Sequence, residues 1–309
     1  MTTGAGDTVE GVLLVDKPAG PTSHDIVDRL RRALGQPRAG HAGTLDPFAT
    51  GLLVLCLGRA TRLARFLGGG AKLYEGVIRL GLATDTDDVT GRPLAGFVPE
   101  LPGGTPDKDA LRRAAASLTG EQSQMPPVFS ARKVGGIPAH RRARRGQQVA
   151  LQPTPVIVHS FELGPAENGR VPFRCLVSPG TYVRALARDL GQRLDTGACL
   201  ESLRRLASGP YRIEEAVPPD LAPELLRCRV QGLDQLPLGL GEIILTEESA
   251  RRFADGQMVS SSGPPGFAEG AAVRVIGPQG LLLGIGRVRE GIEGPRSVQP
   301  EVVFGRREG

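Results

Sequence analysis

The chain has 309 residues, 40% of them hydrophobic, which suffices for one large domain and a smaller one with a sizeable buried core. Its formal net charge is +5, and the positive excess lies in residues 1–239, as a polyanionic partner would require. No apolar run approaches the roughly 18 residues of a membrane span, and the polar, acidic start is unlike a signal peptide, so we expect a cytoplasmic protein.

The cysteines and the glycine-rich stretches argue against a metal or a nucleotide cofactor. Cys56, Cys175, Cys199 and Cys228 lie far apart, without C-x-x-C pairs or neighbouring histidines, so the sequence predicts reduced, buried thiols and no structural metal. The GGGAK stretch at 68–72 lacks the spacing of a P-loop, and GIG at 284–286 lacks the third dinucleotide-binding glycine. We therefore expect no cofactor.

The N-terminal part predicts a strand followed by a helix. The apolar run 11–16 enters a Lys-Pro-Ala-Gly turn, and Thr22 with Asp25 three residues later is typical of a capping box. Ser23, His24 and Asp25 are the residue types of a catalytic triad, but three consecutive residues at a helix start cannot converge on one reacting atom. We predict a structural role for them.

The remaining elements favour an α+β fold with a mixed, largely antiparallel sheet flanked by helices, because their order does not alternate regularly. After Leu240, Gly, Pro and Ser clusters separate short strands, which predicts a small β-rich module at 240–309 beside a larger domain at 1–239. The predicted strands are 52–57, 73–82, 156–163, 171–178, 271–276 and 281–289, and the predicted helices are 59–67, 108–118, 181–194 and 224–234.

Residues 120–150 form a basic segment. Between Arg132 and Arg145 there is no acidic residue. Such a run is typical of an arm that grips RNA and equally of a solvated charged surface, so the sequence alone leaves both interpretations open. The basic residues of the segment are Arg132, Lys133, Arg141, Arg142, Arg144 and Arg145.

The loop between the first helix and the strand at 52–57 carries the most informative residues. Pro47 biases Asp46 toward an extended backbone, and the small residues around it let another chain approach closely. A carboxylate would then be presented rigidly at a groove. On residue chemistry alone, Asp-Pro more often starts a turn than supplies a nucleophile.

This loop, GHAGTLDPFATGLL at 40–53, closely resembles the Gly-Thr-Leu-Asp-Pro motif of the TruB family, the tRNA pseudouridine-55 synthases. The segment LTEESARRFADGQMV at 245–259 resembles, more weakly, the PUA-type RNA-binding domain of the family. The resemblance implies the pseudouridine synthase fold, a PUA-like domain, and isomerisation of uridine at position 55 in the T arm of tRNAs. Five further segments follow in the family order, at 15–32, 72–91, 124–136, 180–191 and 203–211.

The resemblance implies that Asp46 is the catalytic aspartate and that Arg184 keeps its carboxylate charged. An ionised carboxylate can form a transient adduct with the ribose or with carbon 6 of the base, so neither a metal nor a cofactor is needed. The sequence leaves the choice between these adducts open.

The resemblance also implies substrate-binding roles for His41, Tyr74, Tyr182 and Leu203. Tyr74 is expected to stack on the base after it flips out of the RNA, and its hydroxyl is a candidate for moving the carbon 5 proton. Tyr182 lies beside Arg184 in the chain, His41 is expected to contact the RNA, and Leu203 forms an apolar wall. Core packing for the tyrosines and the leucine, and solvation for the histidine, are the ordinary alternatives.

Two departures from the family pattern fall in the basic segment, where Phe129 replaces the usual Tyr and His140-Arg141 replaces Tyr-Glu. They bear on how the arm docks and not on the reaction. The expected partner is the tRNA T arm, bound by a monomer without an obligate protein partner or a membrane. A guide-RNA-dependent synthase and a non-catalytic tRNA-folding chaperone are the alternatives, whereas a zinc deaminase would need ligands that the sequence lacks.

Overall fold

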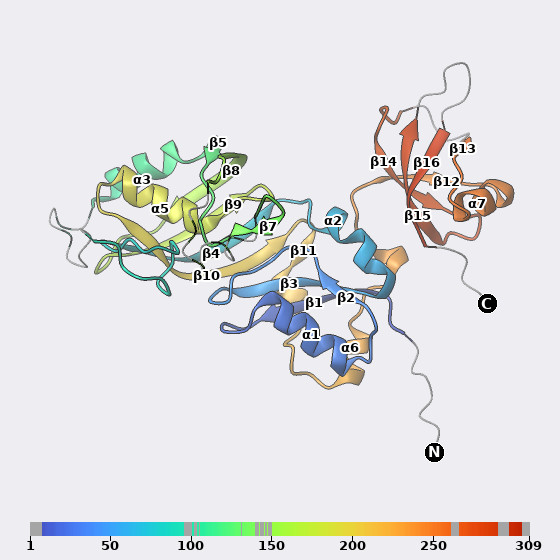
Figure 1. Ribbon diagram of the computed structural model, residues 1–309, viewed down its shortest axis with the longest axis horizontal. Helices are drawn as coiled ribbons and strands as arrows, with labels where there is room; N and C mark the ends of the chain where they lie inside the picture. Colours follow the sequence, from blue (N-terminus) through green and yellow to red (C-terminus); the bar gives the residue numbers. More distant parts are fainter. Residues whose placement is uncertain are drawn as a thin grey trace.

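The computed structural model describes residues 8–95, 101, 104, 106–130, 132–139, 142, 145, 147, 150–260, 266–289 and 297–304; at 133–134 and 137–138 it describes the backbone alone. The fold confirms the predicted α+β class: a nine-stranded, largely antiparallel sheet flanked by helices, and a second, five-stranded sheet built from the C-terminal part (Figure 1). None of the helices within these residues is long and apolar enough to cross a membrane.

The nine-stranded sheet has the order β1-β3-β10-β4-β9-β8-β5, with β2 paired to β3 and β11 paired to β10. Its pairs are antiparallel except β3 with β10, which run parallel. The strands are β1 (Gly11–Lys17), β2 (Ala39–His41), β3 (Thr50–Leu57), β4 (Lys72–Leu80), β5 (Gly120–Gln124), β8 (Thr154–Leu163), β9 (Arg170–Val177), β10 (Ala198–Ser208) and β11 (Tyr211–Arg212).

The helices follow most of the sequence predictions. The capping box of α1 is confirmed: the Thr22 hydroxyl accepts from the Asp25 N–H, and the Asp25 carboxylate accepts from the Thr22 N–H at 2.8 Å. The helices are α1 (Ser23–Ala33), α2 (Ala64–Leu67), α3 (Lys108–Ser117), α5 (Val183–Arg193) and α6 (Pro223–Cys228), with 3-10 turns η1 (Gly58–Leu63), η2 (Ile213–Glu215) and η3 (Leu233–Gln235).

Two details of the C-terminal end of this domain correct the sequence predictions. The helix predicted at 224–234 ends at Cys228, because the backbone of Gln231 pairs with that of Val12 at the edge of β1 (N–O distances 2.8 and 2.9 Å). Cys228 itself is exposed, whereas the other three cysteines are buried as predicted. A cysteine at a helix end beside the solvent does not behave as a core residue.

The basic segment divides between the sheet and a hairpin. Its first residues form β5, which pairs with β8, so they belong to the main sheet and not to an arm. Further along, β6 (Lys133–Val134) and β7 (Ile137–Pro138) pair with each other in a separate two-stranded sheet. His140, Arg141 and Arg144 lie outside the described residues.

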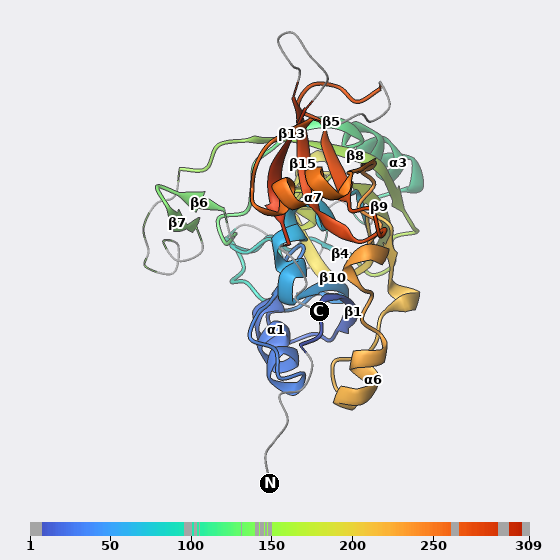
Figure 2. The same cartoon turned by 90° about the vertical axis from the view of Figure 1, so that its right-hand side faces the viewer.

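The C-terminal sheet has the order β12-β14-β15-β16-β13 and packs against its own helix α7. Figure 2 shows it in front of the larger sheet when the molecule is viewed from this end. Its elements are β12 (Gly241–Ile244), α7 (Glu247–Ala254), β13 (Val259–Ser260), β14 (Ala272–Ile276), β15 (Leu282–Arg289) and β16 (Ser297–Val303).

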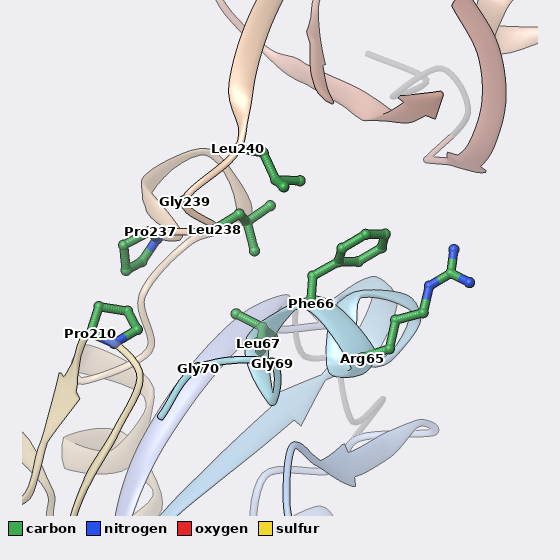
Figure 3. A pocket seen from close by; sticks show the side chains of 10 residues that line it. All are labelled: Arg65, Phe66, Leu67, Gly69, Gly70, Pro210, Pro237, Leu238, Gly239 and Leu240. Carbon is green, nitrogen blue, oxygen red and sulfur yellow. The ribbon is translucent and has the colours of Figure 1, made fainter. Parts of the chain in front are cut away.

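The two sheets share an apolar cluster. Val12 and Val54 of the larger sheet belong to the same buried cluster as Ile285 and Phe304 of the smaller one. Arg59 in η1 adds a hydrogen bond to the Phe304 carbonyl at 2.9 Å. A cavity of about 560 Å³ opens at this junction, between the end of α2 and residues 237–240, and Asp46 does not line it (Figure 3).

Candidate active site

Asp46 and Arg184 meet although 138 residues separate them in the chain. Asp46 lies in the loop between β2 and β3, and Arg184 lies in the first turn of α5. The guanidinium binds both carboxylate oxygens, Nε to Oδ2 at 2.9 Å and Nη2 to Oδ1 at 3.1 Å. The Arg184 side chain is 6% exposed and that of Asp46 is 34% exposed. The fork therefore orients a charged carboxylate from the buried side and leaves its other side open to a substrate.

Arg184 has three further partners, which the sequence prediction missed. Its Nη1 donates to the Thr86 carbonyl at 2.7 Å and lies 3.6 Å from the Asp88 carboxylate, and its Nη2 donates to the Phe129 carbonyl at 3.0 Å. The acid-rich stretch at 85–88 was the available signal for Asp88. Phe129 contributes its backbone, so the replacement of Tyr by Phe leaves this contact intact.

Side chains from other elements hold the backbone of the Asp46 loop. Ser23 in α1 is buried, and its hydroxyl donates to the Leu45 carbonyl at 3.0 Å and accepts from the Leu45 N–H at 2.9 Å. On the other side of Asp46, the Lys17 ammonium donates to the carbonyls of Pro47 at 3.2 Å and Ala49 at 2.8 Å. Side chains of α1 and β1 thus hold the loop backbone on both sides of Asp46.

The ammonium group of Lys17 is buried away from solvent. It is fully buried at the end of β1. Burial lowers the pKa of its ammonium from 10.5 to about 8, while the Asp46 carboxylate raises it and the Arg205 guanidinium lowers it further. Its hydrogen bonds to backbone carbonyls offset part of the free-energy cost of burying the ammonium.

Tyr74 and Leu203 lie on adjacent strands, β4 and β10, and both belong to the buried cluster that contains Leu45 and Ala49 of the Asp46 loop. Burial raises the pKa of the Tyr74 phenol, which stays protonated at neutral pH. The structure therefore places an aromatic ring and an apolar side chain close under the loop that carries the carboxylate.

Tyr182 and His41 occupy the edges of the same region. The backbone N–H of Tyr182 donates to the Gln124 side chain at 2.8 Å, and its carbonyl accepts from the same amide at 3.1 Å, which fixes the start of α5. His41 ends β2, and its Nδ1 is buried without a hydrogen-bond partner in the part of the chain that the structure describes. Burial and the nearby Arg205 guanidinium lower the pKa of His41, so its ring is neutral at pH 7.

Comparison with known proteins gives the same family along both parts of the chain. Residues 31–183 match the TruB family pseudouridylate synthase N-terminal domain, and residues 241–304 match the C-terminal domain of pseudouridine synthase II TruB. The tRNA pseudouridine synthase B of Thermobifida fusca (strain YX) is 42% identical over 309 residues, which cover 96% of this chain and 98% of that protein. That of Opitutus terrae (strain DSM 11246 / JCM 15787 / PB90-1) is 46% identical over 209 residues, 68% of this chain and 85% of that protein.

Solved structures share the fold. The archaeal box H/ACA sRNP Nop10–Cbf5 complex contains a chain that matches with a TM-score of 0.73 at 25% identity, over 97% of this chain and 88% of that one. A chain of a Cbf5–Nop10–Gar1 complex matches with a TM-score of 0.72 at 25% identity, over 94% and 83%. With the Asp46 loop and its arginine in place, these matches lead to one conclusion: the chain belongs to the TruB family of pseudouridylate synthases.

Proposed function

We propose that this protein isomerises uridine to pseudouridine at position 55 in the T arm of tRNAs, with Asp46 as the nucleophile. The observation that carries the proposal is the partly exposed carboxylate of Asp46. The Arg184 guanidinium holds it, and buried side chains fix its loop on both sides. Membership of the TruB family and identity of 37–46% to tRNA pseudouridine synthases B support the reaction.

The chemistry needs a nucleophile that leaves again. The bond between the ribose and nitrogen 1 of uracil breaks, the base rotates, and a bond to carbon 5 forms, while the carbon 5 proton is lost and nitrogen 1 gains one. The Asp46 carboxylate attacks either the ribose or carbon 6 and is released unchanged, so no electrons are gained or lost overall. Both adducts are compatible with the arrangement of Asp46 and Arg184.

The other predicted site residues fit binding of a flipped base. Stacking lost when the uridine leaves the RNA would be replaced in part by the Tyr74 ring, with Leu203 as the apolar wall beside it. Tyr182 borders the site next to Arg184. The His41 side chain is partly exposed at the end of β2, where its ring would contact the RNA.

The rest of the RNA would be held by charge and shape. We propose that the part of the basic segment that follows β5, up to residue 150, and the C-terminal part at 240–309 act as RNA-binding regions of a monomer that works in the cytoplasm without an obligate protein partner. A-form RNA is recognised mainly through its shape and phosphates, so binding should weaken as salt is added.

The test is incubation of the purified protein with an unmodified tRNA transcript, with EDTA and without added cofactor, followed by mapping of pseudouridine. Wild type and Asp28→Asn, which changes a partly exposed aspartate of α1, should modify the T-arm uridine, and Asp46→Ala should not.

Modification by Asp46→Ala would rule out the proposed nucleophile. Tight tRNA binding by wild type without product would favour the alternatives instead, namely a tRNA-folding chaperone or a guide-RNA-dependent synthase. Adding a guide RNA and its target would separate these two.

A further inference from the structure

Arg205 is a charged side chain in the middle of the catalytic sheet. It lies on β10 and is fully buried, with 0% of its surface exposed. Among the described residues, no carboxylate lies within ion-pair distance of it. A buried guanidinium without a carboxylate costs more free energy than a leucine at the same position, so its retention calls for a role that an apolar side chain cannot fill.

The hydrogen bonds of Arg205 run to the Asp46 loop and to the strand that follows it. Its Nε donates to the Leu52 carbonyl at 2.7 Å. Its Nη2 donates to the Gly43 carbonyl at 3.0 Å and its Nη1 to the Thr44 carbonyl at 3.3 Å. The guanidinium therefore fixes Gly43 and Thr44, which hydrogen-bond to neither Ser23 nor Lys17.

The same guanidinium reaches Tyr74. Arg205 and Tyr74 are directly opposite each other in the register of β10 and β4, so their side chains share one face of the sheet. The Arg205 guanidinium acts to lower the pKa of the Tyr74 phenol, against the larger effect of burial. One side chain thus binds the loop of the nucleophile and lies beside the ring expected beneath the base.

We propose that Arg205 is a positioning residue for the isomerisation, which fixes the Tyr74 ring relative to the loop that carries Asp46. The inference rests on the proposed function for its kinetic consequence and on the contacts alone for its structural one. Arginine suits the task because its planar fork can donate in several fixed directions, whereas lysine offers a point charge.

The kinetic test is a double-mutant cycle between Arg205→Lys and Tyr74→Phe on unmodified tRNA. Arg205→Lys should lower kcat by about tenfold or more and change KM by less than about threefold, because positioning acts on the bound state. In the Tyr74→Phe background the same change should cost less than about threefold in kcat. The neighbouring Arg204→Lys, which alters a half-exposed pair with Asp16, should stay within about twofold of wild type. An equal loss in both backgrounds would show that Arg205 only supports the fold and would overturn the proposal.

A spectroscopic test needs no turnover, so it separates failure of this inference from failure of the proposed function. The chain has three tyrosines, at 74, 182 and 211, and no tryptophan. In protein labelled with fluorotyrosine, the resonance absent from Tyr74→Phe identifies Tyr74. Arg205→Lys should shift this fluorine resonance and leave that of Tyr182 in place. An unshifted Tyr74 resonance would contradict the contact.

If Arg205→Lys does not fold, the contact can be tested by changing Tyr74 and observing the side chain of Arg205. Tyr74→Phe removes only a hydroxyl, and it should shift the side-chain nitrogen resonance of Arg205 while that of the buried Arg184 stays unchanged. Unchanged Arg205 resonances would overturn the proposal without an Arg205 variant.

Discussion

Arg184 serves two carboxylates with one positive charge, and the two interactions differ in geometry. The contact with Asp46 is a two-bond fork at 2.9 and 3.1 Å, whereas the nearest approach to Asp88 is 3.6 Å. Fork geometry fixes the direction of a carboxylate, and a single charge contact does not. Asp88 is nevertheless 6% exposed, so it contributes charge balance inside the site.

This difference in geometry predicts which of two variants loses more activity. Arg184→Lys should lower kcat by about a hundredfold or more, because a lysine cannot reproduce the fork that orients Asp46. Asp88→Asn should cost about tenfold, since the fork stays in place. Single-turnover kinetics on tRNA transcripts measure both. Arg188→Lys, one turn later on α5, is the control and should stay within about threefold; an Arg184→Lys protein as active as this control would contradict the role of the fork.

Lys17 links the loop to the pH dependence of stability. In the folded protein its pKa is about 8, against 10.5 for a free side chain. Between these values the folded protein has released the proton and the unfolded chain still holds it, so this group makes folding more favourable as the pH rises. Lys17→Met lacks the effect and should be less stable than wild type by ~2 kcal/mol at pH 7, because the loop carbonyls lose their donor.

The stability gap between wild type and Lys17→Met should therefore widen above about pH 8. Urea unfolding of both proteins at a series of pH values measures the gap, and groups common to both proteins cancel. A gap that stays constant up to pH 10.5 would mean that Lys17 keeps an ordinary pKa in the folded protein.

At the scale of the elements, periodicity predicted those strands and helices whose buried positions are apolar, such as β1, β3 and α1. Periodicity missed β10, which lies between β3 and β4 in the sheet, because the charged Arg205 occupies one of the buried positions of this strand. The family motifs predicted that Asp46 and Arg184 act together, and the structure brings them into contact. The backbone contacts of Arg184 and the buried donors under the loop depend on tertiary packing, which no local pattern in the sequence records.

Close packing between β3 and β10 depends on Gly51. Its φ of +100° is disfavoured for other residues, and a Cβ there would overlap the Arg205 carbonyl oxygen and lie 2.7 Å from the Arg205 nitrogen. Gly51→Ala should therefore destabilise the protein by ~3 kcal/mol or more, measured by urea unfolding. Gly35→Ala has a φ of +64° and open space around its Cβ, so it should cost only ~1 kcal/mol. Equal losses would show that β3 can move away from β10.

At the scale of the whole molecule, the two sheets are joined by a shared core and by polar contacts around it. We call this junction between the sheets the seam. Besides the Arg59 contact with Phe304, Arg62 donates to the Val303 carbonyl and Arg65 pairs with Glu301, so η1 and α2 hold the end of β16 and the residue after it. Strand β3, which follows the Asp46 loop, and strand β1, which pairs with β3, both contribute side chains to the shared core. Weakening the contacts of the seam should therefore also destabilise the nine-stranded sheet.

Phe304 tests this coupling because its ring belongs to the shared cluster, together with Val12 and Val54. Phe304→Ala should destabilise the protein by ~3 kcal/mol and accelerate amide hydrogen exchange in β1 and β3, since removing the ring leaves a cavity against both strands. Phe253→Ala is the matched control: it removes the same buried ring from the separate core of the C-terminal sheet. It should accelerate exchange in β14 and β15 and leave β3 protected. Equal protection of β3 in both variants would mean that the two sheets open independently and that the seam does not stabilise the Asp46 loop.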